Sequence, residues 1–338
     1  MNYLLIIYIL ITILLAIYFK KKKYFLNYSG DIHQLFSNEK NIPLTGGFFL
    51  VLPIILINIQ NYIYISIVIT IFLLGLFSDR KILLSPKKRF LYQSILVLTS
   101  VVLLNLEISS SRLEFFDKLL EYSTFNIIFT SFCLLILING SNFVDGLNGL
   151  LLTYMISVIF VLYNLDLLPS YIINEHVGTF LIILLITLVL LNLSNILMLG
   201  DAGVYILSFF TGYLIITSHI SNSFISPYFF ITLIWYPCFE NLFSILRKLN
   251  NSQSPLIPDN YHLHQLVYTS IKKKYFKSKL GANNFSSFLI LLLNFFIFYL
   301  STIKPYDSTY QISLILVSIL FYLFIYSILR NTQKLKKY

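Results

Sequence analysis

Leu199-Gly-Asp-Ala-Gly203 runs directly into an apolar stretch, Val204–Ile220, and this junction of a short polar motif with a long hydrophobic segment recurs along the chain. A helical segment of that length approaches the roughly 30 Å thickness of the hydrocarbon core of a bilayer. Of the 338 residues, 57% are hydrophobic and only 11% are charged, which excludes an ordinary soluble domain. The chain is therefore predicted to be a helical membrane protein.

Eleven apolar segments are candidates for membrane-spanning helices. The sequence lacks the alternating polar and apolar pattern of barrel strands, so the expected fold class is all-α, a polytopic helical bundle. The whole chain, residues 1–338, is expected to form one transmembrane domain with short loops. The segments are Tyr3–Phe19, Leu44–Gln60, Tyr62–Phe77, Phe90–Leu106, Phe125–Ile138, Leu147–Tyr163, Val177–Leu193, Val204–Ile220, Tyr228–Leu246, Phe285–Leu300 and Gln311–Ile328.

The distribution of basic residues predicts the orientation of the bundle. If residues 20–23 are cytoplasmic and the segments alternate, the inner loops and the C-terminal tail contain 21 of the 24 Lys and Arg residues. This excess follows the positive-inside rule, with the N-terminus outside and the C-terminus cytoplasmic. The first segment lacks a signal-peptide cleavage site and is expected to be a retained anchor. The net charge of +10 is then explained by topology, and no nucleic-acid partner is expected. The loops expected to carry the site are 20–43, 78–89, 139–149, 194–203 and 247–284.

The most polar of these loops is Asn139-Gly-Ser-Asn-Phe-Val-Asp-Gly-Leu-Asn-Gly149, where Asp145 stands among glycines before a helix. Glycine allows a tight turn, and the free N–H groups at a helix start favour phosphate. The amides of Asn139, Asn142 and Asn148 suit sugar hydroxyls or a base. A polar turn in which Asp145 caps the helix explains the same residues without a ligand.

Two further aspartates stand at comparable depth. Asp201 could cap its helix or bind a hard cation through oxygen. Asp79 ends the segment Gly75-Leu-Phe-Ser-Asp79, and the basic residues at 80–89 that follow it are best explained by a salt-bridged turn beside the membrane. The repetition of Gly-flanked aspartates on one face favours a site over isolated caps.

The longest inner loop contains His262-Leu-His264, which suits phosphate contacts better than zinc because no third ligand has a suitable spacing. A solvated pair of histidines remains an alternative. Glu240 is the one formal charge inside the predicted segments and is a functional candidate for that reason. Its structural alternative is a pair with Arg247 on the same helix face.

These motifs, in this order, resemble the polyprenyl-phosphate N-acetylhexosamine-1-phosphate transferase family of membrane enzymes, a relative of phospho-N-acetylmuramoyl-pentapeptide transferase. The resemblance extends from about His33 to Gln265, and the stretch Tyr236–Arg247 is closest to the sugar-phosphate branch. The motifs are His33 with Pro43 and Thr45-Gly-Gly47; Gly75–Asp79 with Arg89 and Gln93; Asn139–Leu150; Leu199–Gly203; and His262-Leu-His264.

Three positions depart from the pattern of that family. Its pair of adjacent aspartates is Ser78-Asp79 here, the second aspartate of its Asp-Gly-x-Asp-Gly element is Asn148, and the third member of its His-x-His-His element is Gln265. These departures put in doubt any mechanism that needs two adjacent aspartates. They leave Asp79, Asp145 and Asp201 in place.

The resemblance implies that undecaprenyl phosphate attacks the β-phosphate of a UDP-N-acetylhexosamine, giving undecaprenyl-diphospho-sugar and UMP. It places this reaction at the cytoplasmic face of a bacterial inner membrane, at the start of O-antigen, capsule or cell-envelope glycan synthesis. It implies Mg²⁺, or Mn²⁺ in its place, with Asp201 as the metal ligand. Asp145 is assigned to the donor and Asp79 to the acceptor phosphate. The residues expected to bind substrate are Asn139, Asn142, Asn148, His33, His262 and His264.

Two other functions remain open from the sequence alone. A catalytically altered scaffold of a glycan-assembly complex is compatible with the three departures. A transporter of lipid-linked cargo would need paired charges deep in the bundle and pseudo-symmetric halves, whereas only Glu240 is deep and no repeat is apparent. The expected partners are undecaprenyl phosphate, a UDP-N-acetylhexosamine and the lipid bilayer, and a homodimer is compatible with the sequence. Which sugar is transferred is left open.

Overall fold

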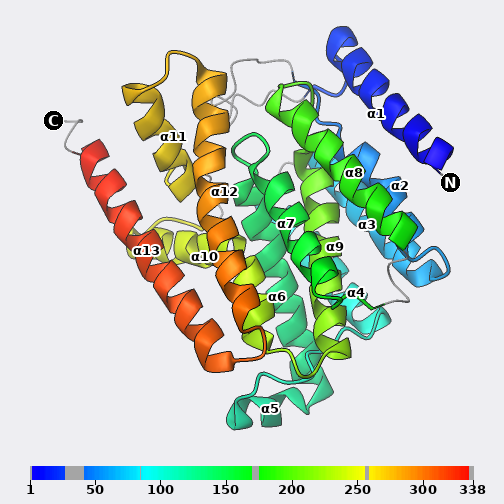
Figure 1. The fold of residues 1–338 in the computed structure, drawn as a ribbon, viewed down its shortest axis with the longest axis vertical. Coiled ribbons are helices and arrows are strands. Elements are labelled where there is room, and N and C mark those ends of the chain that lie inside the picture. Colours follow the sequence, from blue (N-terminus) through cyan, green and yellow to red (C-terminus); the bar gives the residue numbers. More distant parts are fainter. Residues whose placement is uncertain (1, 27–41, 84, 170–174, 256–258, 335–338) are drawn as a thin grey trace.

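The computed structural model describes residues 2–26, 42–83, 85–169, 175–255 and 259–334. Within these ranges the chain forms thirteen helices and no strand, apart from an isolated bridge between Leu44 and Met198 (Figure 1). The helices are α1 (Asn2–Lys22), α2 (Gly46–Ile57), α3 (Tyr62–Asp79), α4 (Pro86–Leu103), α5 (Glu114–Leu120), α6 (Ser123–Val144), α7 (Leu150–Asn164), α8 (Glu175–Leu193), α9 (Gly200–Ser221), α10 (Pro227–Asn250), α11 (Leu263–Lys274), α12 (Lys279–Ile303) and α13 (Ser308–Lys334).

The predicted all-α bundle is confirmed, because each of the eleven predicted segments coincides with a helix. Among the described residues, six helices (α3, α6, α9, α10, α12 and α13) are long and apolar enough to cross a membrane. Shorter apolar helices are α2, α7 and the part of α8 at Gly178–Leu193. The chain is a multi-pass helical membrane protein, and the crossing of all eleven segments stays a prediction.

Helix α9 is the central element of the bundle. Every residue from Ala202 to His219 is buried, and α9 packs against α2, α3, α6 and α7. A helix that is apolar on all sides must be covered by protein or by lipid, and in α9 neighbouring helices provide the cover, which matches the continuous hydrophobic run after Gly203. The first turn of α9, with Asp201, is thereby fixed among the ends of other helices.

Two of the described helices contain an internal proline, and in both a tyrosine from another helix replaces the lost hydrogen bond. Proline has no N–H, so the carbonyl four residues earlier in a helix loses its donor. For Pro53 in α2, that carbonyl accepts a hydrogen bond of 3.0 Å from the Tyr8 hydroxyl. For Pro237 in α10, it belongs to Leu233, which accepts one of 2.9 Å from the Tyr154 hydroxyl.

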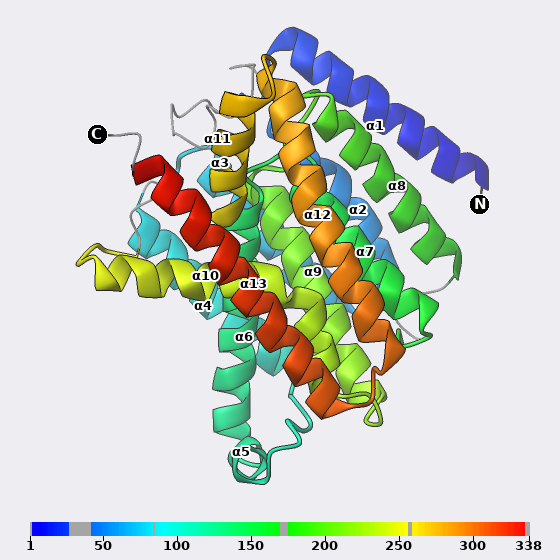
Figure 2. The same ribbon diagram turned by 60° about the vertical axis from the view of Figure 1, so that its left-hand side comes forward.

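Helix α10 changes its course near Pro237. Its second half runs across the direction of α6 and α9 in both views (Figures 1 and 2). The crossing with α6 is close, because a methyl group added at Gly140 would meet the carbonyl oxygen of Pro237 at less than 3.0 Å. This course carries Glu240, Arg247 and Lys248 towards the start of α11 and the end of α6, where the polar residues gather.

Replacing Tyr154 with phenylalanine should lower the free energy of unfolding by about 1–2 kcal/mol, because the buried Leu233 carbonyl then has no donor. The expected result is a lower Tm of the purified protein in detergent. Tyr62→Phe is the control, since the Tyr62 side chain is 82% exposed. An unchanged Tm for Tyr154→Phe would contradict the assigned role of the hydroxyl.

Candidate functional site

The first turn of α9 is held by a carboxylate from the end of α3. Asp79 Oδ1 accepts a hydrogen bond of 2.8 Å from the N–H of Asp201, and Oδ2 accepts one of 3.1 Å from the N–H of Ala202. These N–H groups lack partners within the helix, and a carboxylate at the positive end of a helix is stabilising. Gly200 makes this possible, because its φ is +69° and a methyl group there would lie 2.6 Å from Asp79 Oδ2.

Helices α3 and α9 approach each other very closely beside this contact. A methyl group added at Gly75 would lie less than 3.0 Å from the backbone of Ala202. Glycine at this position therefore sets the distance between the two helices. The same close approach brings Asp79 within reach of the backbone of α9.

Asp201 is paired with an arginine and a serine. Its Oδ2 accepts a hydrogen bond of 2.5 Å from the Ser78 hydroxyl and lies 3.1 Å from Nη1 of Arg89, which also donates to Ser78 Oγ at 3.1 Å. Ser78 is one of the three positions where the sequence departs from the family pattern. Its hydroxyl donates to the Asp201 carboxylate, whereas an aspartate at position 78 would repel that carboxylate. The sequence predicted that Arg89 belongs to a salt-bridged turn, but it did not predict the contact of Arg89 with Asp201. The available indication was that a basic residue follows a motif in which Ser78 replaces an aspartate.

Asp145 is the third carboxylate of this group. It ends α6, and among the described residues its side chain has no hydrogen-bond partner. Burial, followed by the nearby charges of Asp201 and Asp79, raises the pKa of Asp145 well above its ordinary value. The three aspartates that the sequence singled out are thus close enough to repel one another.

The donor atoms around Asp145 and Asp201 fit a hard divalent cation. Oxygen is the ligand atom that Mg²⁺ prefers, and a cation would offset the charges of Asp201 and Asp79 that, after burial, raise the pKa of Asp145. In the part of the chain that the structure describes, no three His, Cys, Asp or Glu side chains form a complete metal site. Magnesium commonly takes one or two protein carboxylates and completes its coordination with water and substrate phosphates.

Asp145→Asn should make the metal-free protein more stable at high pH than the original. A carboxyl group whose pKa is raised by folding holds a proton that the unfolded chain releases, so stability falls as pH rises above the unfolded pKa. The advantage in Tm of the asparagine variant, measured in EDTA, should therefore grow between about pH 5 and pH 8. A constant difference across this range would mean that folding does not raise the pKa of Asp145.

The asparagines of the loops predicted to be cytoplasmic mostly make contacts within the protein. Asn148 is buried, its backbone N–H donates to Asn283 Oδ1, and its side chain donates to Asn195 Oδ1 at 2.7 Å. Asn139 donates to a glutamine of α4 at 3.1 Å, and Asn142 is half-buried in the last turn of α6. Asn148 therefore holds the turn before α7, and its binding of substrate stays a prediction together with that of Asn139 and Asn142.

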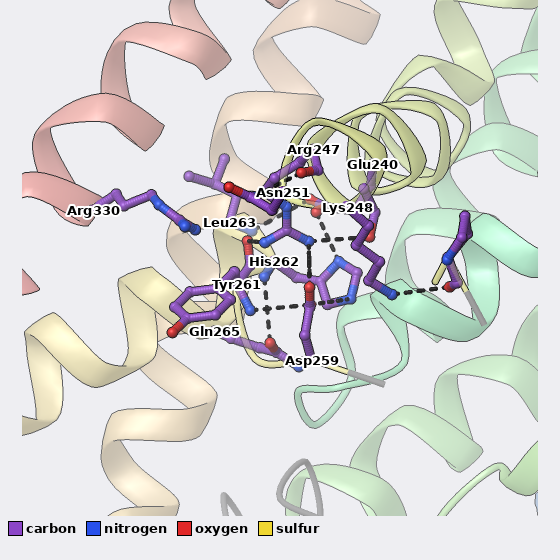
Figure 3. Close-up of polar contacts among 12 residues, drawn as sticks. Glu240, Arg247, Lys248, Asn251, Asp259, Tyr261, His262, Leu263, Gln265 and Arg330 are labelled. Carbon is purple, nitrogen blue, oxygen red and sulfur yellow. Dashed lines mark hydrogen bonds and ion pairs between the residues drawn. The ribbon is translucent and has the colours of Figure 1, made fainter. Parts of the chain in front are cut away.

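The two histidines of the motif His262-Leu-His264 lie at the start of α11 (Figure 3 labels His262). The rings of His262 and His264 are nearly parallel with centroids 5.7 Å apart, and the ring of Phe143, two residues before Asp145, is 4.8 Å from that of His262. The sequence motifs around Asp145 and around the histidines are thus neighbours in space.

His264 is completely buried beside the glycine that follows Asp145. Its Nδ1 is 3.5 Å from the Tyr236 hydroxyl, and its Nε2 has no hydrogen-bond partner among the described residues. A methyl group at Gly146 would lie 2.6 Å from that nitrogen. Burial lowers the pKa of His264 to about 3, so the ring is neutral at physiological pH.

The structure corrects the partner considered for Glu240. Glu240 bonds to His262, whereas Arg247 pairs with Asp259 at 3.0 Å (Figure 3). Gln265, the third departure from the family pattern, accepts a hydrogen bond from the backbone N–H of His262 at 3.4 Å. A glutamine three residues into a helix that bonds back to its first residue is half of a capping box, so this position supports the start of α11.

The N-terminal motif is described only in part. His33 lies outside the described residues, and its predicted contact with substrate stays a prediction. The segment from Pro43 to Gly47 pairs with the residues just before Asp201, since Met198 N–H donates to the Pro43 carbonyl at 2.8 Å. Gly47 N–H donates in turn to the carbonyl of Leu199 at 3.3 Å. Two motifs that are far apart in the sequence therefore support the same turn.

Known proteins that are similar to this chain come from the family that these motifs resemble. Residues 61–219 match the model of a family described as Glycosyl transferase family 4. The chain is 26% identical over 240 residues to the undecaprenyl-phosphate alpha-N-acetylglucosaminyl 1-phosphate transferases of Salmonella typhi and Salmonella typhimurium, covering 67% of this chain and 65%, just under two thirds, of those proteins. It is 23% identical over 296 residues to a probable undecaprenyl-phosphate N-acetylglucosaminyl 1-phosphate transferase of Bacillus subtilis, covering 84% of this chain and 78% of that protein.

Proposed function

We propose, from the match of residues 61–219 to the model of glycosyl transferase family 4, that this chain transfers a sugar 1-phosphate from a UDP-N-acetylhexosamine to undecaprenyl phosphate and releases UMP. The observation that carries the proposal is the group of Asp79, Asp145 and Asp201, which three separate helices bring together at one end of the bundle. The names of the Salmonella and Bacillus relatives support the lipid acceptor.

The proposed reaction asks for positioning and charge compensation more than for covalent help. An oxygen of the acceptor phosphate attacks the β-phosphorus of the donor, and the bond from that phosphorus to the oxygen bridging to the α-phosphate breaks, so UMP leaves. A phosphate monoester has a second pKa near about 6, so the attacking group is largely dianionic at neutral pH. The barrier arises from bringing two anions together, which fixed geometry and positive charge lower.

The residues present suit these tasks. Asp201 would hold the metal ion, which when bound supplies positive charge to the pyrophosphate oxygens. Asp145, assigned to the donor, would offer a second carboxylate close to the same ion. Asp79 fixes the first turn of α9 through two backbone bonds, and this supports a positioning role beside its predicted contact with the acceptor phosphate. Arg89, paired with Asp201, is a second source of positive charge at the same point.

The orientation of the chain and its biological setting belong to the same proposal. Eleven crossings, with the N-terminus outside and the C-terminus in the cytoplasm, would place the three aspartates and both histidines at the cytoplasmic face of a bacterial inner membrane. The excess of Lys and Arg in the inner loops supports this orientation. The product would begin a surface glycan such as O-antigen, capsule or another envelope polymer.

The deciding experiment measures UMP release by the purified chain in detergent. Undecaprenyl phosphate, Mg²⁺ and a panel of UDP-N-acetylhexosamines are supplied, with and without EDTA. Lipid-dependent release that EDTA abolishes is the expected result, and the active donor identifies the sugar. No release across the panel, with an active relative as positive control, would favour the scaffold function instead.

A further inference from the structure

Glu240 is a fully buried carboxylate on the second half of α10. An unpaired charge in such a place is very costly, and Glu240 is accordingly surrounded by donors. Oε1 is 2.9 Å from His262 Nδ1 (Figure 3). Oε2 accepts from the Tyr322 hydroxyl at 2.9 Å and from the backbone N–H of Leu263 at 3.4 Å. The carboxylate thus joins α10 to the first residues of α11 and to α13.

His262 is itself buried, and this contact determines which of its ring nitrogens carries the hydrogen. A carboxylate can only accept hydrogen bonds, so Nδ1 must carry the hydrogen directed at Glu240. The other nitrogen, Nε2, is 3.7 Å from Asp259 Oδ1, beyond hydrogen-bonding distance. Asp259 itself is held by Arg247 at 3.0 Å. Nε2 is therefore the ring nitrogen without a hydrogen bond among the described residues, and it lies beside the Asp259 carboxylate.

The ring that Glu240 orients is close to the proposed site. Phe143 packs against His262 with ring centroids 4.8 Å apart and lies on the last turn of α6, which Asp145 ends. Lys248 lies on the same half of α10 as Glu240, and its ammonium is 5.8 Å from the centre of the Phe143 ring. An oriented imidazole and a cation thus flank the turn that carries Asp145.

We propose that Glu240 is a positioning residue for the donor: it fixes the tautomer and the direction of His262 so that Nε2 meets the phosphates of the UDP-sugar. This inference rests on the proposed function. It differs from a purely structural role, in which Glu240 would only hold α11 and α13 in place. In the latter case its loss would lower stability and activity whether or not His262 is present.

Glu240→Gln separates the two roles. The backbone N–H of Leu263 can only donate, so the amide oxygen of a glutamine stays on that side and its NH₂ group faces His262 Nδ1. That nitrogen must then accept, and the tautomer is reversed while size and packing are kept. In metal sites, mutation of the residue that orients a ligating histidine typically costs about 10-fold or more in affinity or activity. We expect a fall of about 10-fold or more in kcat/KM for the UDP-sugar here.

The test is a double-mutant cycle with His262→Ala. If Glu240 acts through His262, Glu240→Gln should change kcat/KM by less than about 2-fold once the histidine is gone. An equal loss in both backgrounds, or full activity of Glu240→Gln, would overturn the proposal. Tyr154→Phe is the control for lost stability, since it weakens α10 without touching His262.

Binding of UMP, measured by calorimetry on the same four proteins, keeps this proposal separate from the proposed function. If the unchanged chain shows no turnover, the proposed reaction is wrong. The dissociation constants of UMP for the four proteins can still show whether the effect of Glu240→Gln depends on His262. Glu240→Gln should weaken the affinity for UMP when His262 is present and should have no effect on it in the His262→Ala background. Independent, additive effects on UMP affinity would contradict the proposal.

Discussion

Replacing Asp201 with asparagine should abolish magnesium-dependent UMP release, with a loss of about 1,000-fold or more if the carboxylate is the main metal ligand. Asparagine keeps the size of the side chain and can still accept from Ser78 and Arg89, so the contacts within the protein are largely retained. What is lost is the negative charge needed by a hard cation. The measurement is initial rate against Mg²⁺ concentration, with Tm as a check on folding.

Asp166→Asn is the matched control for this change, because Asp166 is exposed and its φ of +51° suits asparagine. Its activity should equal that of the unchanged chain. If Asp201→Asn keeps full activity at saturating Mg²⁺, the assignment of Asp201 as metal ligand is wrong. In that case Asp145 would become the leading candidate among the described carboxylates.

Gly75→Ala should damage the site severely although it adds only one methyl group. That group would meet the backbone of Ala202 on α9 at less than 3.0 Å, and backbone cannot move aside as a side chain can. Overpacking of this kind costs about 1–3 kcal/mol, or more when no relaxation is possible. Activity should fall further than stability, because a displacement of about 1 Å at reacting groups can cost about 100-fold in rate.

Gly281→Ala provides the comparison, because its new methyl group would meet only the side chains of Phe276 and Ser278, at 3.1 Å or more. Both variants are measured for Tm and for UMP release. If Gly75→Ala is as stable and active as Gly281→Ala, the separation of α3 and α9 does not control the site.

Much of the fold follows from the sequence because hydrophobic length is a direct signal for a helix in a membrane. Each apolar run became a helix, and the Gly-flanked aspartates Asp145 and Asp201 lie near each other as their equivalent depth suggested. The position of Glu240 also marked it as unusual, since a charge inside a hydrophobic run needs a partner.

The identity of partners could not be predicted in the same way. The link between Glu240 and His262 depends on the change of course of α10, and the pair of Arg89 with Asp201 depends on two helix ends that are 112 residues apart in the chain. Likewise, nothing local indicates that Asn148 holds a turn through two other asparagines. Such contacts are set by tertiary packing, which a pattern along one chain does not encode.

The tyrosines that complete the two proline-containing helices have a consequence for how this chain can vary. Pro237 and Tyr154 lie on different helices, yet the hydroxyl is useful only while the proline leaves Leu233 without a donor. Among related sequences, we expect phenylalanine to replace Tyr154 chiefly where a non-proline residue replaces Pro237, and the same coupling should link Tyr8 with Pro53. The two residues of each pair should therefore covary in an alignment of related sequences, although they are far apart in the chain.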